Sequence, residues 1–195
     1  MSIKKYSISD LKSFAYTNII PNGNFVNATG WDDSVSVISA INNTLLVTGD
    51  GGNVNPGTDQ NTGYPLANGK KFFVSVKVQV TNAVCTQFVL QAYTSGDDFI
   101  ANIKVHSTPA INTVYDINGV VTIGAQVGNF QPKLTHWYAD AGTANGKVMK
   151  VQEFYAIDLT SLFGAGNEPL VADCLNIFKF VDGTLQPNLS KTLIL

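Results

Sequence analysis

The stretch KKFFVSVKVQV, residues 70–80, decides the fold class. Every second residue from Phe72 to Val80 is apolar, and most of the positions between them are polar. Successive side chains of a β-strand point to opposite faces of a sheet, so this period of two predicts a strand with one face in a core. The predicted core face carries Phe72, Val74, Val76, Val78 and Val80, and the opposite face carries Phe73, Ser75, Lys77 and Gln79.

The same alternation recurs along the chain, with turn residues between the runs. In CTQFVLQAYTS, residues 85–95, one face carries Phe88, Leu90 and Ala92. Further runs of strand composition cover residues 101–108, 113–125, 132–140 and 147–159. Roughly eight short strands joined by turns are typical of a two-sheet sandwich. We therefore expect an all-β protein, specifically a jelly-roll β-sandwich.

Charged residues are scarce in this sequence. Only 13% of the 195 residues are charged, the formal net charge is −2, and all twelve basic residues are lysines. Arginine makes the bidentate contacts with phosphate and guanine, and a basic surface attracts nucleic acid. We therefore expect no nucleic-acid partner.

The N-terminal residues and the cysteines bear on the compartment. The first 14 residues, MSIKKYSISDLKSF, lack the apolar core of a secretory signal, and no run of 18 apolar residues occurs. We expect synthesis in the cytoplasm without a signal peptide, and no membrane contact. Cys85 and Cys174 have neither disulfide-framework nor metal-site spacing, so we expect two free, mostly buried thiols.

Three parts are expected along the chain. Residues 1–17 form an N-terminal arm with one or two helical turns, residues 18–160 form the sandwich, and residues 161–195 form a joint, a short helix and an extended tail. Residues 49–65 are expected to be one long polar loop. The apolar last residues, KTLIL at 191–195, favour a docking strand over a free end.

Several motifs together resemble the jelly roll of carbohydrate-binding modules. They are NIIPNGNFVNATGWDDSVSV at 18–37, TLLVTG at 44–49, YPLANGKKFFVSVKV at 64–78, TVYDINGVVTIGA at 113–125 and GTANGKVMKVQEFYAIDL at 142–159. Such modules commonly start with an asparagine-glycine turn before a phenylalanine and bury the aromatic of a later glycine-aromatic pair, which matches Trp31 here. The resemblance implies a domain that binds saccharide.

Two further motifs resemble a segment of phage proteins. IDLTSLFGAGNEP at 157–169 and FVDGTLQ at 180–186 are similar to a segment that recurs in tail and minor structural proteins of bacteriophages infecting Gram-positive bacteria. With the sandwich motifs, the resemblance spans about residues 18–186. It implies a virion component of the tail or adsorption apparatus, whose partners are other virion proteins, identical copies and cell-wall saccharide.

The resemblance also bears on a structural calcium ion. In many such modules a glutamate follows the first phenylalanine and helps to hold calcium, but this position is Val26 here. Asp158 matches the usual acidic position in the last strand only loosely. We expect no cofactor, with structural calcium as the minor alternative.

No catalytic constellation is recognisable in the sequence. The adjacent pairs Asp32-Asp33 and Asp97-Asp98 fall in predicted turns, where neighbouring carboxylates point apart and are solvated. His106 and His136 have no cysteine or carboxylate at metal-site or triad spacing, so ordinary surface or core roles are expected. We expect no enzymatic activity and no catalytic residue.

A polar face with aromatic residues is the candidate saccharide site. Sugar hydroxyls bond to amides, and aromatic rings cover the apolar faces of sugar rings. If the strands 72–80 and 85–94 are paired, one face carries Lys77, Gln79, Gln87, Gln91 and Tyr93, with Phe73 at its edge and Asn102, Lys104 and His106 as an extension. The other candidates are Tyr64 at the end of the polar loop and either Trp137 or Tyr138, of which one points outward. A solvated or packed sheet face without a ligand is the alternative.

Two functions remain open from the sequence. The first is host adsorption by a non-enzymatic phage tail protein that contacts cell-wall saccharide. The second is a capsid or tail decoration protein that forms homo-oligomeric contacts without binding saccharide.

The segment LFGAGNEP, residues 162–169, is interpreted as a structural joint. It lacks the third glycine of a dinucleotide loop and the Gly-Lys-Ser/Thr of a phosphate loop. Gly164 and Gly166 allow a sharp exit from the last strand, and Pro169 suits the first turn of a helix. Glu168 is expected near the positive end of that helix.

Overall fold

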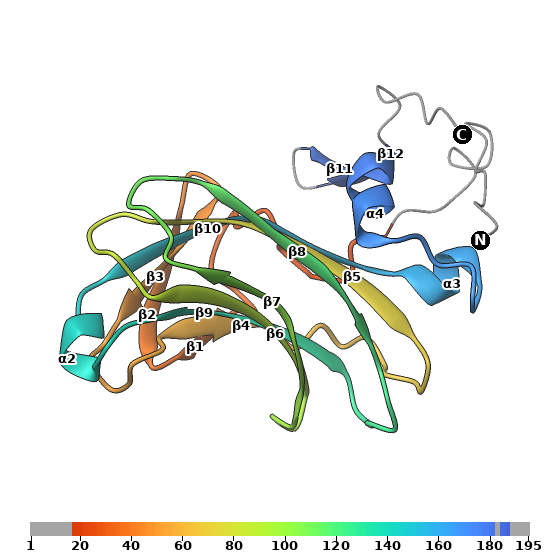
Figure 1. Ribbon diagram of the computed structural model, residues 1–195, viewed down its shortest axis with the longest axis horizontal. Helices are drawn as coiled ribbons and strands as arrows, with labels where there is room; N and C mark the ends of the chain where they lie inside the picture. Colours follow the sequence, from red (N-terminus) through yellow and green to blue (C-terminus); the bar gives the residue numbers. More distant parts are fainter. Residues whose placement is uncertain (1–16, 182–183, 188–195) are drawn as a thin grey trace.

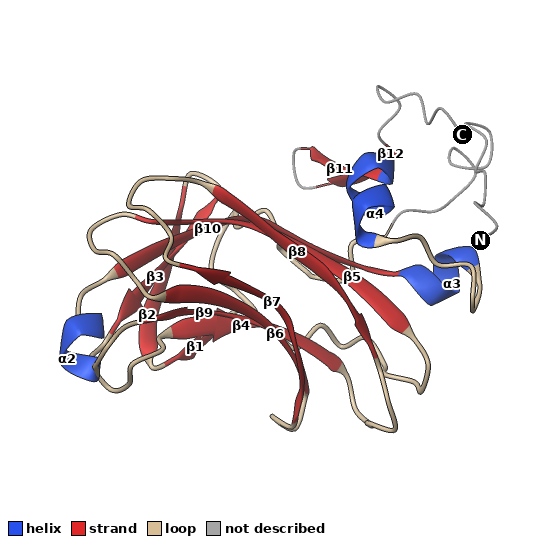
Figure 2. Ribbon diagram, in the orientation of Figure 1, coloured by secondary structure: helices blue, strands red, loops and turns tan. Residues whose placement is uncertain are grey.

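The computed structural model describes residues 17–181 and 184–187 and confirms the β-sandwich. Two five-stranded antiparallel sheets pack face to face (Figure 1), with short helices only at the two ends (Figure 2). Sheet I has the order β1-β4-β9-β6-β7, with β1 Asp32–Ser34, β4 Gly57–Asp59, β9 Phe130–Trp137, β6 Gln87–Thr94 and β7 Phe99–Ser107. Sheet II has the order β2-β3-β10-β5-β8, with β2 Ser36–Ile41, β3 Thr44–Gly49, β10 Val148–Asp158, β5 Lys71–Val80 and β8 Tyr115–Thr122.

The core lies between the two sheets and contains the residues that alternation selected. All five predicted core residues of β5, from Phe72 to Val80, are at most 1% exposed. Sheet I supplies Phe88, Leu90 and Ala92 from β6, which are fully buried. The period of two therefore identified the inward face of one strand in each sheet correctly.

The N-terminal motif of the sandwich is fixed against β10. The Asn18 side chain accepts a hydrogen bond from the Ala156 backbone N–H at 3.0 Å, and the Phe154 N–H donates to the Gly23 carbonyl at 2.9 Å. Gly23 cannot be replaced without moving this strand, since a Cβ there would collide with the Phe154 carbonyl. Trp31 is 4% exposed and packs between the rings of Phe25 and Phe154, as expected for a buried aromatic.

The pairing of strands 72–80 and 85–94, on which the single polar face depended, does not occur. β5 pairs with β10 and β8 in sheet II, whereas β6 pairs with β9 and β7 in sheet I. The connection between β5 and β6 crosses from one sheet to the other. Alternation reports which face of a strand is buried, but it carries no information about the neighbouring strand.

Two segments that were expected to be loops or turns are short strands. β4 lies inside the expected polar loop 49–65, and Asp32 and Asp33 lie in β1, which pairs with β4. β4 contains no large apolar residue because Gly57 lies directly on β9: a Cβ there would come within 2.6 Å of the Leu134 carbonyl. Without an apolar alternation, these strands give no signal in the sequence.

The segment after β10 covers one end of the outer face of sheet II (Figure 1). It forms α3 (Leu159–Phe163), α4 (Val171–Ile177) and the hairpin of β11 (Phe178–Val181) with β12 (Thr184–Pro187). A second hydrophobic cluster joins Phe73 and Ile157 of the sheet to Cys174 and Ile177 of α4. Phe73 is therefore fully buried, and the expectation that it borders an exposed polar face is wrong.

The residues of LFGAGNEP turn the chain between α3 and α4. Gly164 and Gly166 have φ values of 82° and 79°, which L-residues with a side chain rarely adopt. Glu168 accepts hydrogen bonds from Lys71 at 3.1 Å and from the Thr160 hydroxyl at 2.8 Å, so its carboxylate binds sheet II and α3. The predicted short helix is present as α4, and Pro169 stands just before it.

The remaining expectations concern the cysteines, membrane contact and the two ends of the chain. Cys85 and Cys174 are free and buried, as predicted. No helix in the described part of the chain is long and apolar enough to span a bilayer. The helical turns expected at the N-terminus and the docking strand expected at 191–195 fall outside the described residues.

Candidate functional site

The strand register places a set of polar side chains together on the outer face of sheet I. Across this sheet Asp32 faces Asp59, Asp59 faces Lys133, and Lys133 faces Gln91. Tyr93 faces Gln131, two residues along β6 and β9 from the pair of Gln91 and Lys133. Directly opposed residues share a face. The other face of these strands holds the buried core, so the polar set points outward.

A cleft of about 440 Å³ opens on this face. Its floor and sides come from β1, β4, β6, β9 and the β6–β7 turn. Ligand pockets in proteins commonly have volumes of about 300–1,000 Å³. The cleft is lined by Asp32, Asp33, Ser34, Asp59, Asn61, Tyr93, Ser95, Asp97, Gln131 and Lys133.

Gln131 and Lys133 organise the floor of the cleft. The Gln131 Nε2 donates to Asp59 Oδ1 at 2.9 Å and to Asp97 Oδ1 at 3.1 Å, which joins β4 to the β6–β7 turn through β9. The Lys133 ammonium lies 3.7 Å from Asp59 Oδ2 and 5.5 Å from the centre of the Tyr93 ring. Amide, carboxylate, ammonium and aromatic groups therefore meet within one cleft.

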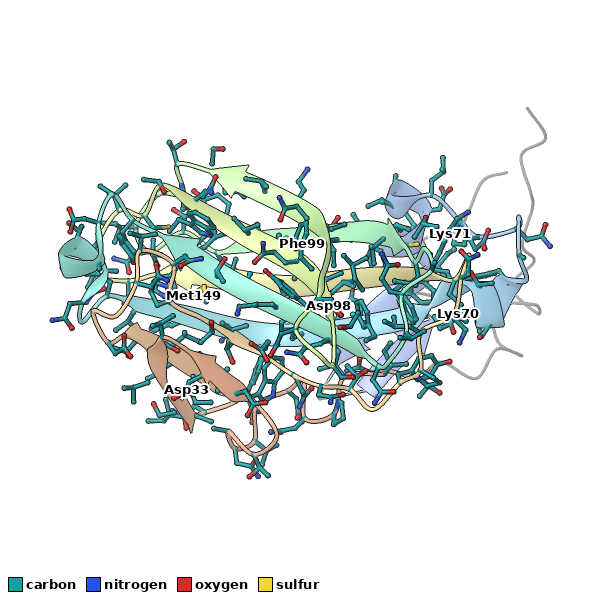
Figure 3. All side chains as sticks on the ribbon, turned by 90° about the horizontal axis from the view of Figure 1, so that it is seen from below. Asp33, Lys70, Lys71, Asp98, Phe99 and Met149 are labelled. Atoms are coloured by element: carbon teal, nitrogen blue, oxygen red, sulfur yellow. The ribbon has the colours of Figure 1, made fainter. Side chains whose placement is uncertain are left out.

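Two aromatic rings stand at the side of the cleft formed by the β6–β7 hairpin. Tyr93 of β6 and Phe99 of β7 contact each other edge to face, with 5.5 Å between ring centroids, and Phe99 is 52% exposed. Figure 1 shows this hairpin bending down from sheet I, and Figure 3, seen from below, shows Phe99 and Asp98 near the middle of the view and Asp33 on the strand at its lower edge. The hairpin thus forms a wall that carries apolar ring surface.

Burial and neighbouring charges shift the pKa values of two groups in the cleft, Asp59 and Tyr93. The pKa of Asp59 is raised, chiefly because burial disfavours the ionised carboxylate, and Asp32 and Asp97 add to the increase against the opposing effect of Lys133. The pKa of Tyr93 is raised by burial and by the charges of Asp59 and Asp97. The two shifts indicate a site where negative charge is incompletely compensated.

Several predicted site residues extend the same face beyond the cleft. Gln87 faces Trp137 across the β6–β9 pair, and Trp137 is the outward member of the pair Trp137-Tyr138. The Gln91 side chain donates to the Asn102 Oδ1 at 3.0 Å. Gln87, Gln91, Tyr93, Trp137 and Asn102 are therefore brought to one face, as the sequence predicted for most of them.

The other predicted site residues lie elsewhere. Lys77 and Gln79 are on the outer face of sheet II, where Lys77 pairs with Glu153. Tyr138 is buried beside His136, and the Tyr64 hydroxyl donates to Asp158 at 3.0 Å, outside the cleft. These four residues do not share a site with Tyr93.

A β-bulge in the β6–β7 pair makes Lys104 and His106 face differently from Asn102. The register of β6 and β7 shifts between Leu90 and Gln91, so Lys104 and His106 face the inward residues Leu90 and Phe88. The His106 ring packs on Tyr115, with 4.2 Å between centroids. The expectation that Lys104 and His106 extend the polar face with Asn102 is therefore wrong.

The histidines have the ordinary roles that the sequence indicated. His136 is fully buried, its Nδ1 contacts the Tyr138 hydroxyl at 3.0 Å, and burial lowers its pKa to about 3. His136 is thus a neutral core residue, whereas His106 packs at the edge of the sandwich.

Of the ten residues that line the cleft, sequence reasoning had proposed only Tyr93. Asp32, Asp33 and Asp97 were interpreted as solvated turn residues, and Asp59, Gln131, Lys133 and Phe99 were not candidates. An alternation within PKLTHWYAD already places Lys133, Thr135 and Trp137 on one face, which is a signal for Lys133. Nothing in the sequence indicates that β1 and β4 lie next to β9, because that is a property of the topology.

The acidic position that the resemblance linked to structural calcium, Asp158, is engaged by other side chains. Asp158 is bound by the Lys70 ammonium at 2.9 Å, by the Tyr64 hydroxyl at 3.0 Å and by the Ser161 hydroxyl at 2.7 Å. Within residues 17–181 and 184–187, no three His, Cys, Asp or Glu side chains are grouped so that they could hold a metal ion. The positive charge next to the Asp158 carboxylate is the ammonium group of Lys70.

Comparison with known proteins identifies the fold. No protein-family profile matches the sequence, and no curated protein matches it. Among solved structures, the arabinose-bound MgGH51 α-L-arabinofuranosidase matches with a TM-score of 0.63 and 13% identity, over 83% of this chain and 29% of that one. A CBM4 carbohydrate-binding module matches with a TM-score of 0.51 and 11% identity, over 67% of this chain and 96% of the module.

A phage protein is also among the structural matches. The enzymatically active domain of tailspike protein 4 from bacteriophage CBA120 matches with a TM-score of 0.50 and 12% identity, over 71% of this chain and 21% of that one. This chain thus spans less than a third of the arabinofuranosidase and the tailspike structures, but nearly all of the binding module. At these identities the matches establish the fold, which is a β-sandwich of the carbohydrate-binding-module kind.

Proposed function

We propose that the protein binds saccharide through the cleft on sheet I, as a non-enzymatic component of a bacteriophage tail or adsorption apparatus. The observation that carries the proposal is the cleft itself, in which the Tyr93 ring lies beside the side chains of Asp59, Asp97 and Gln131, with the Phe99 ring packed against Tyr93. Aromatic rings can cover the apolar face of a sugar, and carboxylates and amides accept and donate hydrogen bonds to its hydroxyls.

The geometry favours recognition over hydrolysis. The two best-placed carboxylates, Asp59 and Asp97, are both engaged by the Gln131 amide, and Asp59 is also paired with Lys133. Groups held by several partners are suited to fixing the orientation of a ligand. Three structural matches that are carbohydrate-binding modules support the same choice.

The virion part of the proposal rests on different support. The joint LFGAGNEP and the following FVDGTLQ resemble a segment of phage structural proteins, and a phage tailspike domain shares the fold. A tail protein that contacts cell-wall saccharide would use the chemistry that the cleft offers.

A decoration role without saccharide is the second candidate. Val37 and Ile41 lie on the outer face of sheet II, on the edge strand β2, and are 62% and 57% exposed. An apolar edge of this kind suits contact with another subunit. In this case the cleft on sheet I has no ligand.

Glycan binding separates the two candidates. The purified protein is tested on a glycan array and on Gram-positive cell walls, and the affinity of the best ligand is then measured by calorimetry. We expect Tyr93→Ala to weaken binding about tenfold, which corresponds to about 1.4 kcal/mol. The matched control is Lys77→Ala, which alters the outer face of sheet II and is expected to bind like the wild type.

A negative result is equally informative. If the wild type binds no glycan or wall preparation, saccharide binding is rejected and the decoration role is favoured. If Lys77→Ala weakens binding and Tyr93→Ala does not, the ligand lies on sheet II and the cleft is not the site.

A further inference from the structure

The charge of the cleft restricts the class of saccharide, provided that the cleft is the saccharide site proposed above. Three carboxylates, Asp32, Asp59 and Asp97, line it with a single ammonium, Lys133, which leaves a formal charge of −2. The whole chain carries only −2, so negative charge is concentrated at this place. A cleft of one sign raises the local concentration of ligands of the opposite sign.

The carboxylates come from three separate elements and are held close together. Asp32 lies on β1, Asp59 on β4 and Asp97 in the β6–β7 turn. Because Gln131 Nε2 bonds both Asp59 and Asp97, at 2.9 Å and 3.1 Å, the two bonded oxygens are about 6 Å apart at most. Of Asp32, Asp59 and Asp97, only Asp59 has an ion-pair partner within the described residues.

One ammonium group, that of Lys133, is already bound in the cleft. Lys133 Nζ lies 3.7 Å from Asp59 Oδ2 and 5.5 Å from the Tyr93 ring centroid, so a cation sits between a carboxylate and an aromatic face. A further carboxylate and a further ring belong to the β6–β7 hairpin, which carries Asp97 and the exposed Phe99. The cleft therefore offers more carboxylates than its own lysine can compensate.

We propose that the cleft selects a saccharide that carries a free ammonium group, such as an oligomer of hexosamine units without N-acetylation. Its sugar ring packs against Tyr93 and Phe99, and its ammonium pairs with the uncompensated carboxylates. Two opposite charges a few ångströms apart attract each other more strongly near a protein surface than in bulk water, because the effective dielectric constant is lower there. The same interaction opposes glycopolymers with phosphate or carboxylate groups.

Three oligosaccharides of equal length test the proposal. They are a β-1,4-linked glucosamine oligomer, its N-acetylated counterpart and an oligomer of a uronic acid, and their affinities are measured by calorimetry at low and high salt. We expect the glucosamine oligomer to bind at least about tenfold more tightly than the N-acetylated one, with an affinity that falls as salt rises. The uronic acid oligomer is expected not to bind.

The matched variants are Asp97→Asn and Asp116→Asn. Asparagine at position 97 keeps the acceptor for Gln131 and suits the positive φ of 64° at this position, so the fold is preserved while one charge is removed. Asp97→Asn is expected to lower the affinity for the glucosamine oligomer and to leave that for the N-acetylated oligomer unchanged. Asp116→Asn removes an exposed charge from sheet II and is expected to change neither affinity.

The outcomes distinguish this inference from the proposed function. Equal or tighter binding of the N-acetylated oligomer, or tight binding of another neutral glycan through Tyr93, overturns the charge selection but leaves saccharide binding intact. An affinity for the glucosamine oligomer that is equally sensitive to Asp97→Asn and Asp116→Asn also overturns it. Absence of binding to any glycan rejects both.

Discussion

Two clusters in this molecule are built from the same three residue types and behave in opposite ways. At the end of β10, Lys70 lies 2.9 Å from Asp158 and 4.8 Å from the Tyr64 ring. In the cleft, Lys133 lies 3.7 Å from Asp59 and 5.5 Å from the Tyr93 ring. The pKa of Asp158 is lowered, whereas the pKa of Asp59 is raised.

The difference lies in what surrounds each carboxylate. Burial opposes ionisation of Asp158, but hydrogen bonds from Lys70, from the backbone and hydroxyl of Ser161 and from Tyr64 outweigh it. Burial also opposes ionisation of Asp59, where two further carboxylates, Asp32 and Asp97, add to the effect. A satisfied cluster stabilises the fold, while an incompletely compensated one is what a binding site needs.

The largest expected effect is on the free energy of unfolding, through the cluster of Asp158, Lys70 and Tyr64. Asp158→Ala leaves the Lys70 ammonium and the Tyr64 hydroxyl without their acceptor and removes the side chain that caps α3. We expect the free energy of unfolding to fall by about 3 kcal/mol, measured by urea denaturation. The matched variant Asp59→Ala is expected to lower it by less than about 1 kcal/mol, because the ionised carboxylate there is already unfavourable.

Equal losses for the two variants would contradict the comparison. In that case Asp59 stabilises the fold as Asp158 does, and the charge of Asp59 no longer distinguishes the cleft as a binding site.

The tyrosine hydroxyls give a smaller contrast. Tyr64→Phe removes a hydrogen bond to a charged acceptor, so we expect a loss of about 1.5 kcal/mol. The Tyr93 hydroxyl has no hydrogen bond among the described contacts, and Tyr93→Phe is expected to change stability by less than about 0.5 kcal/mol. Thermal unfolding of both variants checks the pair, and a larger loss for Tyr93→Phe would reverse the assignment of the two clusters.

The pH dependence of stability provides the finest test. Since the pKa of Asp59 is raised in the folded protein, its carboxylate opposes folding above that pKa, and Asp59→Asn removes this effect. We expect the Tm at pH 7 to rise by about 1–3 °C, with the gain disappearing below about pH 3.8, where the carboxyl is protonated in both states.

Asp158→Asn should have the opposite signature. The pKa of Asp158 is lowered by folding, so its contribution is fully present above about pH 3.8 and is lost as pH falls through the folded value. The Tm of this variant is expected to lie below that of the wild type at pH 7 and to approach it in acid. A Tm of Asp59→Asn below that of the wild type at pH 7 would show that the charge of Asp59 is fully compensated.

The sequence predicted the fold because alternation is a local property. The inward face of β5 and β6, the buried Trp31 and the short helix α4 each follow from residues close together in the chain. The buried state of Phe73 could not be predicted, since it depends on α4, which lies about 100 residues further along.

The candidate site was predicted only in part for the same reason. Gln87, Gln91 and Tyr93 lie on one strand, so their common face follows from alternation. The cleft also needs Asp32, Asp59 and Asp97, which come from two short strands and a turn that meet only through the strand order of sheet I. Pairing across a sheet is determined by topology, and two five-stranded sheets allow many orders.

The attachment of both flanking segments to β10 has a mechanical consequence. Ile19 bonds Ala156, and the chain leaves the same strand after Asp158, so the two connections of the sandwich lie side by side on sheet II. The cleft lies on the outer face of sheet I, beyond the core. A force applied between a ligand in the cleft and the two flanking segments therefore passes from sheet I to sheet II. The core packing between the sheets bears this force, and the contact of Trp31 with Phe154 of β10 lies close to the anchored strand.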